Sequence, residues 1–230
     1  MPDQFVLPFA DRPALGREEF IVAACNDQAV RFIRRWPDWP APAAAVYGPP
    51  GCGKSHLAAI WQASSGADVI AARDLSRLSA LSPGSAALAI EDMDREQPSA
   101  TRDRVLLDLF ERPERSLLFT GRLPPADWPV ALGDLKSRLQ SLIGFPIWAP
   151  DDAFLSALVR KHFDDRQLDV PRPVVDRIVT HVERTPESIA RFVARADRKA
   201  LSEKRAVTPK LVLELIDNEE KGQGLGKAAP

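Results

Sequence analysis

The sequence predicts an α/β fold in which a five-stranded parallel sheet with flanking helices is followed by a small all-helical domain. Residues 48–55 read Gly-Pro-Pro-Gly-Cys-Gly-Lys-Ser, which fits the phosphate-binding pattern G-x-x-x-x-G-K-[ST]. Up to residue 150, short apolar runs alternate with stretches of helical spacing. After residue 150 only helical spacing remains. Alternation of this kind is typical of a parallel sheet with crossover helices.

Composition excludes several classes of protein. The 230 residues carry 31 basic and 32 acidic side chains, a balance that argues against a broad non-specific surface for nucleic acid but not against a local basic patch. The two cysteines do not form a disulfide framework. No apolar run has the length of a membrane span, and the N-terminus lacks a signal pattern. We therefore expect a cytoplasmic protein without membrane contact.

The phosphate-binding pattern lies between an apolar run at 43–47 and a helical stretch that begins at His56, so the loop is expected at a helix N-terminus, where anions are favoured. Its glycines let backbone N–H groups turn toward phosphate, Lys54 supplies charge for the β- and γ-phosphates, and the Ser55 hydroxyl completes a Mg²⁺ shell. The alternative is a Gly/Pro turn with an accidental Lys-Ser. The expected nucleotide-binding residues of the loop are Gly48, Pro49, Pro50, Gly51, Cys52, Gly53, Lys54, Ser55 and His56.

The remaining elements follow from apolar runs and helical spacing. A lead-in and helix over 18–35 end at a proline-rich stretch, because proline cannot continue a helix. The predicted strands are 43–47, 68–72, 86–90, 116–120 and 144–148. The predicted helices between them include 74–82, 101–110 and one that ends with residues 135–139. In such a sheet the ligand lies at the carboxyl ends of the strands.

Acidic and polar residues follow two of these strands. Glu91, Asp92 and Asp94 come directly after the apolar run 86–90, where folds of this type hold Mg²⁺ and orient the attacking water. We expect Glu91 to ligate Mg²⁺ and Asp92 to orient water. For Asp94 a structural role as a helix cap after the strand is the alternative. Thr120 ends another strand and is expected to face the γ-phosphate.

Four helical stretches form the second domain, with a boundary near Pro150. The predicted division is an extended arm over 1–15, an α/β domain over 16–150, a helical domain over 151–220 and a disordered tail over 221–230.

The arm contains the string Gln-Phe-Val-Leu-Pro-Phe. Gln4 can anchor an extended peptide by hydrogen bonds, Leu7 and Phe9 can fill an apolar groove, and Pro8 lowers the cost of ordering. From the residues alone, Leu7 and Phe9 folding back on the domain is an equally good interpretation. The pattern Q-x-x-L-x-F resembles the peptide by which bacterial replication proteins bind the DNA polymerase sliding clamp.

Together these features resemble the AAA+ domain of the DnaA family of replication initiators. Residues 53–56, Gly-Lys-Ser-His, are similar to the family's Gly-Lys-Thr-His, and residues 120–125 resemble its sensor 1 stretch T-S-D-R-P-P. The Leu-Lys-Ser-Arg-Leu at 135–139 resembles its L-x-S-R-[FL] box, whose arginine, here Arg138, acts as a finger on a neighbour's nucleotide. Residues 20–26 resemble its F-V-x-G-x-x-N segment near the adenine, which places Ile21 there.

The resemblance is closest to regulators of the Hda type, which are DnaA-related but lack the DNA-binding domain, and after residue 218 we expect no room for one. It implies ADP or ATP with Mg²⁺ as ligands, and the sliding clamp and DnaA as partners. It further implies that the protein promotes hydrolysis of DnaA-bound ATP, which inactivates the initiator and prevents over-initiation. No direct sequence-specific DNA binding is expected. The sequence leaves open which nucleotide is retained and whether the chain forms a homo-oligomer.

Three departures from the family pattern bear on hydrolysis. Glu91 stands where the family has Asp, the sensor 1 stretch reads Thr-Gly-Arg at 120–122, and Glu187 occupies the register of the sensor 2 arginine, so Arg184 or Arg191 would have to substitute. These changes predict weak hydrolysis by this chain itself. The alternatives are a self-sufficient ATPase, such as a helicase loader or clamp-loader subunit, and a DNA-binding relative of the initiator. For Arg138 the alternative is a structural salt bridge.

Overall fold

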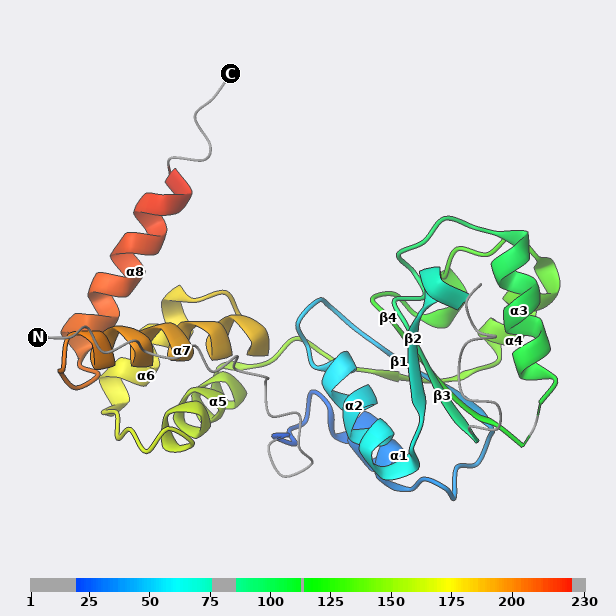
Figure 1. Ribbon diagram of the computed structural model, residues 1–230, viewed down its shortest axis with the longest axis horizontal. Coiled ribbons are helices and arrows are strands. Elements are labelled where there is room, and N and C mark those ends of the chain that lie inside the picture. The colour runs from blue at the N-terminus through cyan, green and yellow to red at the C-terminus, as the bar shows by residue number, and fades with distance from the viewer. Residues whose placement is uncertain (1–19, 76–85, 113, 225–230) are drawn as a thin grey trace, which may run out of the picture.

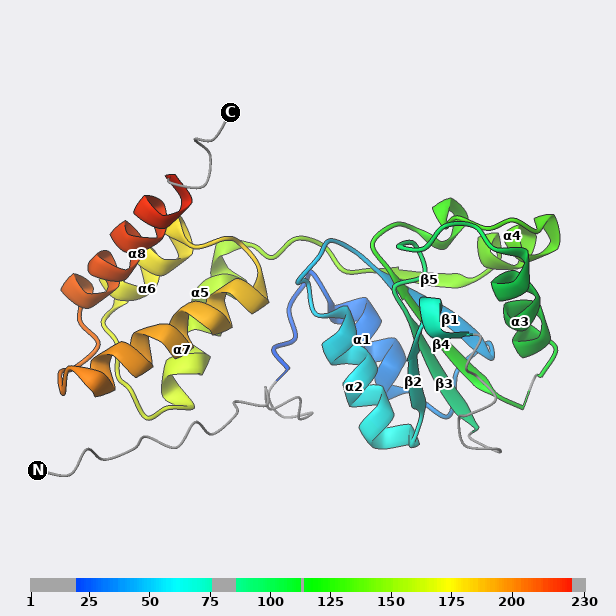
Figure 2. The same ribbon diagram turned by 45° about the horizontal axis from the view of Figure 1, so that its top comes forward.

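The computed structural model describes residues 20–75, 86–112 and 114–224. The predicted arm with Gln4, Leu7, Pro8 and Phe9, and most of the helix predicted over 74–82, therefore lie outside the described residues. Figures 1 and 2 show an α/β core and a helical lid domain that are joined by extended segments.

The core is built on five parallel strands in the order β2-β3-β4-β1-β5, as predicted for the fold class. β1, β3 and β4 consist almost entirely of buried residues, because helices cover both faces of a parallel sheet. The strands are β1 (Ala43–Tyr47), β2 (Asp68–Ala71), β3 (Ala87–Glu91), β4 (Ser116–Gly121) and β5 (Ile143–Pro146).

Two helices pack on each face of the sheet (Figure 2). The side chains of α1 and α2 share one apolar cluster with the strands, and those of α3 and α4 share another. A short 3₁₀ turn, η2 (Pro125–Asp127), precedes α4. The helices are α1 (Asp27–Arg34), α2 (Lys54–Ser65), α3 (Ala100–Phe110) and α4 (Gly133–Gln140).

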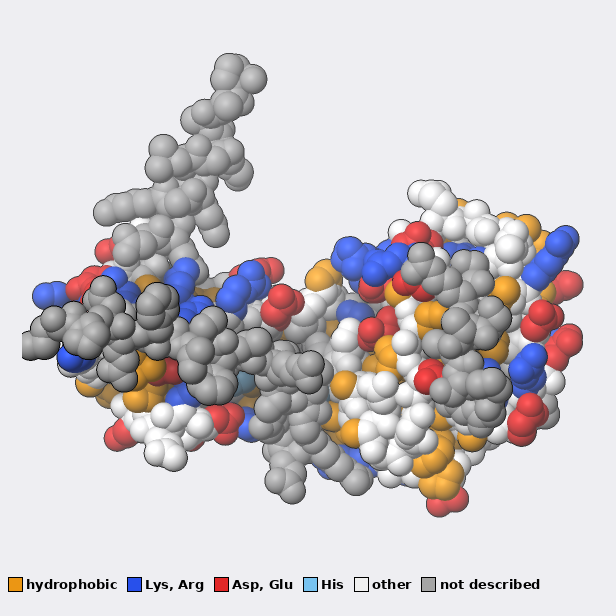
Figure 3. Space-filling view, viewed as in Figure 1, with side chains coloured by type: hydrophobic (Ala, Val, Ile, Leu, Met, Phe, Trp, Pro, Cys, Tyr) orange, Lys and Arg blue, Asp and Glu red, His pale blue; other side chains and the backbone are white. Residues whose placement is uncertain are grey.

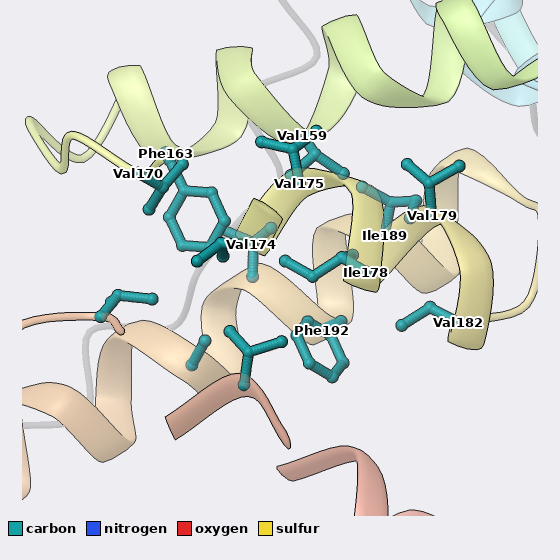
Figure 4. Packing of buried hydrophobic residues seen from close by; sticks show 14 of the residues in the cluster. Val159, Phe163, Val170, Val174, Val175, Ile178, Val179, Val182, Ile189 and Phe192 are labelled. Carbon is teal, nitrogen blue, oxygen red and sulfur yellow. The ribbon is translucent and has the colours of Figure 1, made fainter. Parts of the chain in front are cut away.

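The lid domain is a bundle of four helices around an apolar core. Figure 4 shows Phe163, Ile178 and Phe192 pointing into the same interior from three helices. The helices are α5 (Asp152–Asp164), α6 (Arg172–His181), α7 (Pro186–Ser202) and α8 (Pro209–Gly224). The last helix ends at Gly224, inside the range 221–230, and the division into an arm, two domains and a disordered tail stays a prediction.

A lead-in segment, residues 20–26, contacts both domains. Asn26 shapes it: its Oδ1 accepts a hydrogen bond from Ala23 N (2.9 Å) and its Nδ2 donates to Ile21 O (3.0 Å). Ile21, Ala23 and Cys25 pack against the apolar cluster of the lid. Cys25 O also accepts a hydrogen bond from Trp148 N (2.9 Å) in the segment that leaves β5. The lead-in segment therefore ties the lid to the core.

Within the described ranges 20–75, 86–112 and 114–224, no helix combines the length and the apolarity that a bilayer span requires.

Candidate nucleotide-binding site

The predicted phosphate loop connects β1 to α2 and requires glycine at three positions. Gly51 and Gly53 have φ angles of 72° and 103°, a left-handed region that only glycine enters without strain, and Gly53 caps α2. At Gly48 a Cβ atom would collide with the carbonyl oxygen of Ile147. The glycines thus set a tight loop that ends on the first turn of a 12-residue helix.

Lys54 is held over this loop by the loop's own backbone. Its Nζ donates to Gly48 O (2.8 Å) and to Pro49 O (2.9 Å), and it lies 3.7 Å from the Sγ atom of Cys52. Burial raises the pKa of the Cys52 thiol, and the Lys54 ammonium opposes this rise only in part. Cys52 is therefore a neutral packing residue. A phosphate on the loop would take the place of the two carbonyl acceptors of Lys54.

The acids after β3 have three different environments. Glu91 is half-buried, and its Oε1 atom is enclosed without a hydrogen-bond partner among the described residues. Asp92 has a left-handed backbone (φ 60°) and forms an ion pair with Arg95, with 3.2 Å between Oδ2 and Nη1. Its backbone N donates to the Thr120 hydroxyl (3.4 Å), so the buried Thr120 holds the turn after β3.

Asp94 has the structural role that the sequence left open. Its Oδ2 accepts hydrogen bonds from the backbone N atoms of Arg122 (2.7 Å) and Leu123 (2.9 Å). This carboxylate therefore fixes the turn that follows β4.

The departure at sensor 1 has a packing reason. A Cβ atom on Gly121 would lie 2.6 Å from Nε1 and 2.9 Å from Cε2 of Trp128. The same indole N–H donates to Leu123 O (2.7 Å), which fixes the ring. A serine at position 121 would displace this buried ring, so glycine is required there.

The loop and Glu91 fit a nucleotide with its metal. The loop presents backbone N–H groups at a helix N-terminus, and the enclosed Oε1 of Glu91 is a carboxylate oxygen in need of a partner. Mg²⁺ in such sites takes few protein ligands and keeps phosphate and water oxygens, so Ser55 and Glu91 would be its protein ligands here. Among the described residues there is no group of three or more His, Cys, Asp or Glu side chains that could hold a metal ion.

The lid and the lead-in segment border the phosphate loop. Thr185, the N-cap of α7, is the lid residue nearest to Gly51: a Cβ atom there would lie 2.9 Å from Thr185 Cβ. From the other side the Phe20 ring meets His56 edge-on, with 5.0 Å between ring centroids. Ile21 packs against the lid cluster.

The two candidates for sensor 2 differ in their contacts. Arg184 forms an ion pair with Asp152 and also donates to Pro150 O (3.4 Å). Arg191 is two thirds exposed and lies 3.7 Å from the carboxylate of Glu187. Neither contact involves the phosphate loop.

Sequence reasoning missed Thr185 as a residue of this site. The string Thr-Pro-Glu-Ser at 185–188 entered the sequence analysis only as the register of the sensor 2 arginine, which Glu187 occupies, although such a string is also typical of a helix start. Nothing in the string shows that this helix start meets Gly51.

Arg138 lies elsewhere, in the last turn of α4. In Figures 1 and 2 this helix is at the end of the core that is remote from the lid. Arg138 is exposed, and within the described residues it forms no ion pair; its guanidinium lies 6.0 Å from the centroid of the Phe110 ring. The structural salt bridge considered above is therefore absent from the described residues. Arg138 is not brought together with its own chain's phosphate loop.

The segment before α4 is anchored by Asp103, which is fully buried. Its Oδ2 accepts hydrogen bonds from the backbone N atoms of Ala131 (2.5 Å) and Leu132 (3.0 Å). Its Oδ1 pairs with the buried Arg102, 3.1 Å away. Asp103 thus fixes the start of α4 and, with it, the position of Arg138. The sequence offered no signal for this role.

Comparison with solved structures places the fold. AMPPCP-bound DnaA from Aquifex aeolicus matches with a TM-score of 0.74 and 15% identity, over 91% of this chain and 70% of that one. Domain III of DnaA from Thermotoga maritima matches with a TM-score of 0.73 and 14% identity, over 90% of this chain and 97% of that one. The chain has a DnaA-like AAA+ fold. A point mutant of RuvB from Thermotoga maritima matches with a TM-score of 0.64 and 16% identity, over 84% of this chain and 67% of that one. No protein-family model and no curated protein sequence matches.

Proposed function

We propose that the chain is an Hda-type regulator of replication initiation. It holds ADP or ATP with Mg²⁺ between core and lid, binds the sliding clamp through Gln4, Leu7, Pro8 and Phe9, and promotes hydrolysis of the ATP bound to DnaA. The observation that carries the proposal is Arg138, an exposed arginine without an ion pair among the described residues, on a DnaA-like AAA+ fold and remote from the chain's own phosphate loop.

In this proposal Arg138 acts on the partner's nucleotide. Its guanidinium carries a permanent charge and five donors, so it can stabilise the charge that develops on a transferring phosphoryl group. An arginine supplied by a second protein in this way is worth roughly 10³–10⁵ in rate. Because no carboxylate of the described residues neutralises Arg138, its charge is available to a partner.

The chain's own nucleotide has a structural role. The loop from Gly48 to Lys54 holds the phosphates, and Ser55 with Glu91 holds Mg²⁺, which neutralises phosphate charge when bound. Core and lid both border this loop, so a ligand there stabilises their contact. Asp92 is paired with Arg95, and position 122 carries an arginine where the family pattern has an acid. Both features disfavour orientation of an attacking water.

Direct sequence-specific DNA binding is not part of the proposal. One DnaA structure similar to this chain is described as bound to AMPPCP and single-stranded DNA. In the present chain basic and acidic side chains are nearly equal in number, and Figure 3 shows both signs interspersed over core and lid on the face in view. Such a surface gives little of the phosphate attraction on which DNA binding depends.

A self-sufficient ATPase, such as a helicase loader, is the second candidate, favoured by Lys54 and by the free oxygen of Glu91. Single-turnover hydrolysis of ATP preloaded on DnaA, with clamp loaded on DNA, separates the two. We expect acceleration by this protein that depends on the clamp, together with little hydrolysis by the protein alone. Rapid steady-state hydrolysis without DnaA, and no effect on DnaA-bound ATP, would reverse the assignment.

A further inference from the structure

The lid reaches the phosphate loop through a threonine. A Cβ atom on Gly51 would lie 2.9 Å from Cβ, 3.3 Å from Cγ2 and 3.3 Å from Oγ1 of Thr185. Gly51 is therefore glycine both because of its left-handed φ angle of 72° and because Thr185 occupies the space beside it. No other lid residue lies among the three nearest atoms to any described glycine of the loop.

Thr185 is held rigidly in this place. Its backbone N donates to Glu183 O (2.7 Å), and its Oγ1 accepts from the backbone N of Ser188 (3.1 Å). Ser188 Oγ in turn donates to the Glu183 carboxylate (2.9 Å). The preceding residue, Arg184, is ion-paired with Asp152 at the start of α5. A side chain fixed from both neighbours can position a ligand at little cost in entropy.

The hydroxyl group of Thr185 has an unused donor. A hydroxyl group can donate one hydrogen bond and accept two. The Ser188 N–H uses one acceptor position, and the described residues provide no acceptor for the hydroxyl proton. An oxygen of a phosphate on the adjacent loop is an acceptor of the right kind. The N-terminus of α7, a helix of 17 residues, favours negative charge at the same place.

The charged residues in the first two turns of α7 pair with each other. Arg191 and Glu187 are 68% and 72% exposed in their side chains and lie 3.7 Å from each other. Arg191 Nη2 also lies 3.4 Å from Ser188 Oγ, on the helix rather than on the loop.

We propose that Thr185 binds the terminal phosphate of a nucleoside diphosphate through its hydroxyl group. The proposal rests on the nucleotide site proposed above and names a lid residue that binds the phosphate end of that nucleotide. The predicted contact is a charge-assisted hydrogen bond, so its loss weakens binding of the diphosphate about tenfold or more.

The test is calorimetric titration of the full chain with ADP and with AMP. Thr185→Val removes the hydroxyl group at nearly constant shape, and Thr185→Ser keeps it. We expect Thr185→Val to weaken ADP binding at least about tenfold while AMP binding changes less than about twofold, and Thr185→Ser to match the wild type. Melting curves show that each variant is folded at the temperature of titration.

Arg191→Ala is the matched control and should leave both affinities unchanged. An equal loss for ADP and AMP in Thr185→Val would show a purely structural role and overturn the inference. So would a selective loss of ADP binding in Arg191→Ala, or unchanged ADP binding in Thr185→Val. A wild-type protein that binds no ADP overturns the nucleotide site itself, which is a distinct result.

Discussion

The phosphate loop and the α4 end of the core hold their basic residues in opposite ways. At the loop, Lys54 is fixed by two carbonyl oxygens at 2.8 and 2.9 Å. At the α4 end, Arg138 is exposed and contacts only an aromatic ring among the described residues. The fixed position of Lys54 lowers the cost of binding the nucleotide that we propose for this loop. Arg138, which we propose acts on a partner's nucleotide, would be positioned by that partner.

The backbones of the two regions do not show the same difference as their basic side chains. Gly51 and Gly53 give the loop its left-handed backbone angles, and the buried Asp103 fixes the segment that leads into α4. The contrast between the two regions lies in their side chains. The following variants separate the two regions, in order of the effect that we expect.

Arg138→Ala should affect only the α4 end. We expect it to remove about 10³-fold or more of the stimulation of DnaA-bound ATP hydrolysis, measured in single turnovers with DNA-loaded clamp. Binding of ADP and of the clamp should be unchanged. Arg138→Lys should restore little, because the planar fork of the guanidinium is lost. Full stimulation by Arg138→Ala would mean that the finger belongs to DnaA, and that this chain is only a tether.

Asp103→Ala should damage the support of α4. It leaves the buried Arg102 without its partner and two backbone N–H groups without an acceptor, which costs about 3–5 kcal/mol of unfolding free energy. Denaturant unfolding measures the loss. Asp108→Ala, an exposed position on the same helix, is the control and should change stability by less than about 0.5 kcal/mol. Similar values for the two variants would contradict the role of Asp103.

Lys54→Ala should affect only the phosphate loop. ADP at about 100 times its Kd adds about 2.7 kcal/mol to the unfolding free energy of a protein that binds it only in the native state, and so raises Tm. The variant should lose this ADP-dependent rise in Tm. Lys136→Ala on α4 removes an exposed positive charge that is far along the chain from the phosphate loop. This variant should keep the ADP-dependent rise in Tm. If Lys54→Ala retains the full ADP-dependent shift, the nucleotide lies elsewhere.

Leu7→Ala together with Phe9→Ala tests the arm, which lies outside the described residues. Truncation of anchors that fill a groove costs about 2 kcal/mol or more each, so affinity for the sliding clamp should fall at least about tenfold. Tm should be unchanged, because the arm is proposed to bind the clamp rather than the domain. Val6→Ala is the control within the arm. A fall in Tm with unchanged clamp affinity would support the interpretation in which Leu7 and Phe9 fold back.

Much of the fold was readable from the chain. Each of the five predicted strands is present, because short apolar runs such as residues 87–90 suit strands that are buried on both faces of a parallel sheet. The four helices of the lid follow from apolar spacing that supplies one shared core. The loop at Gly48–Ser55 was readable for another reason: its backbone geometry demands glycine, so the pattern survives in the sequence itself.

What the sequence by itself determined was therefore local: where strands and helices occur, and which loop can cradle a phosphate. The tertiary structure alone decided that Thr185 meets Gly51, that Trp128 requires Gly121, and that Asp103 carries the segment before α4. These pairs are separated by 134, 7 and 28 residues along the chain, and the shortest of them still depends on how a buried ring packs. Periodicity reports what a single element buries, whereas contacts between elements arise only when the sheet and the lid have packed.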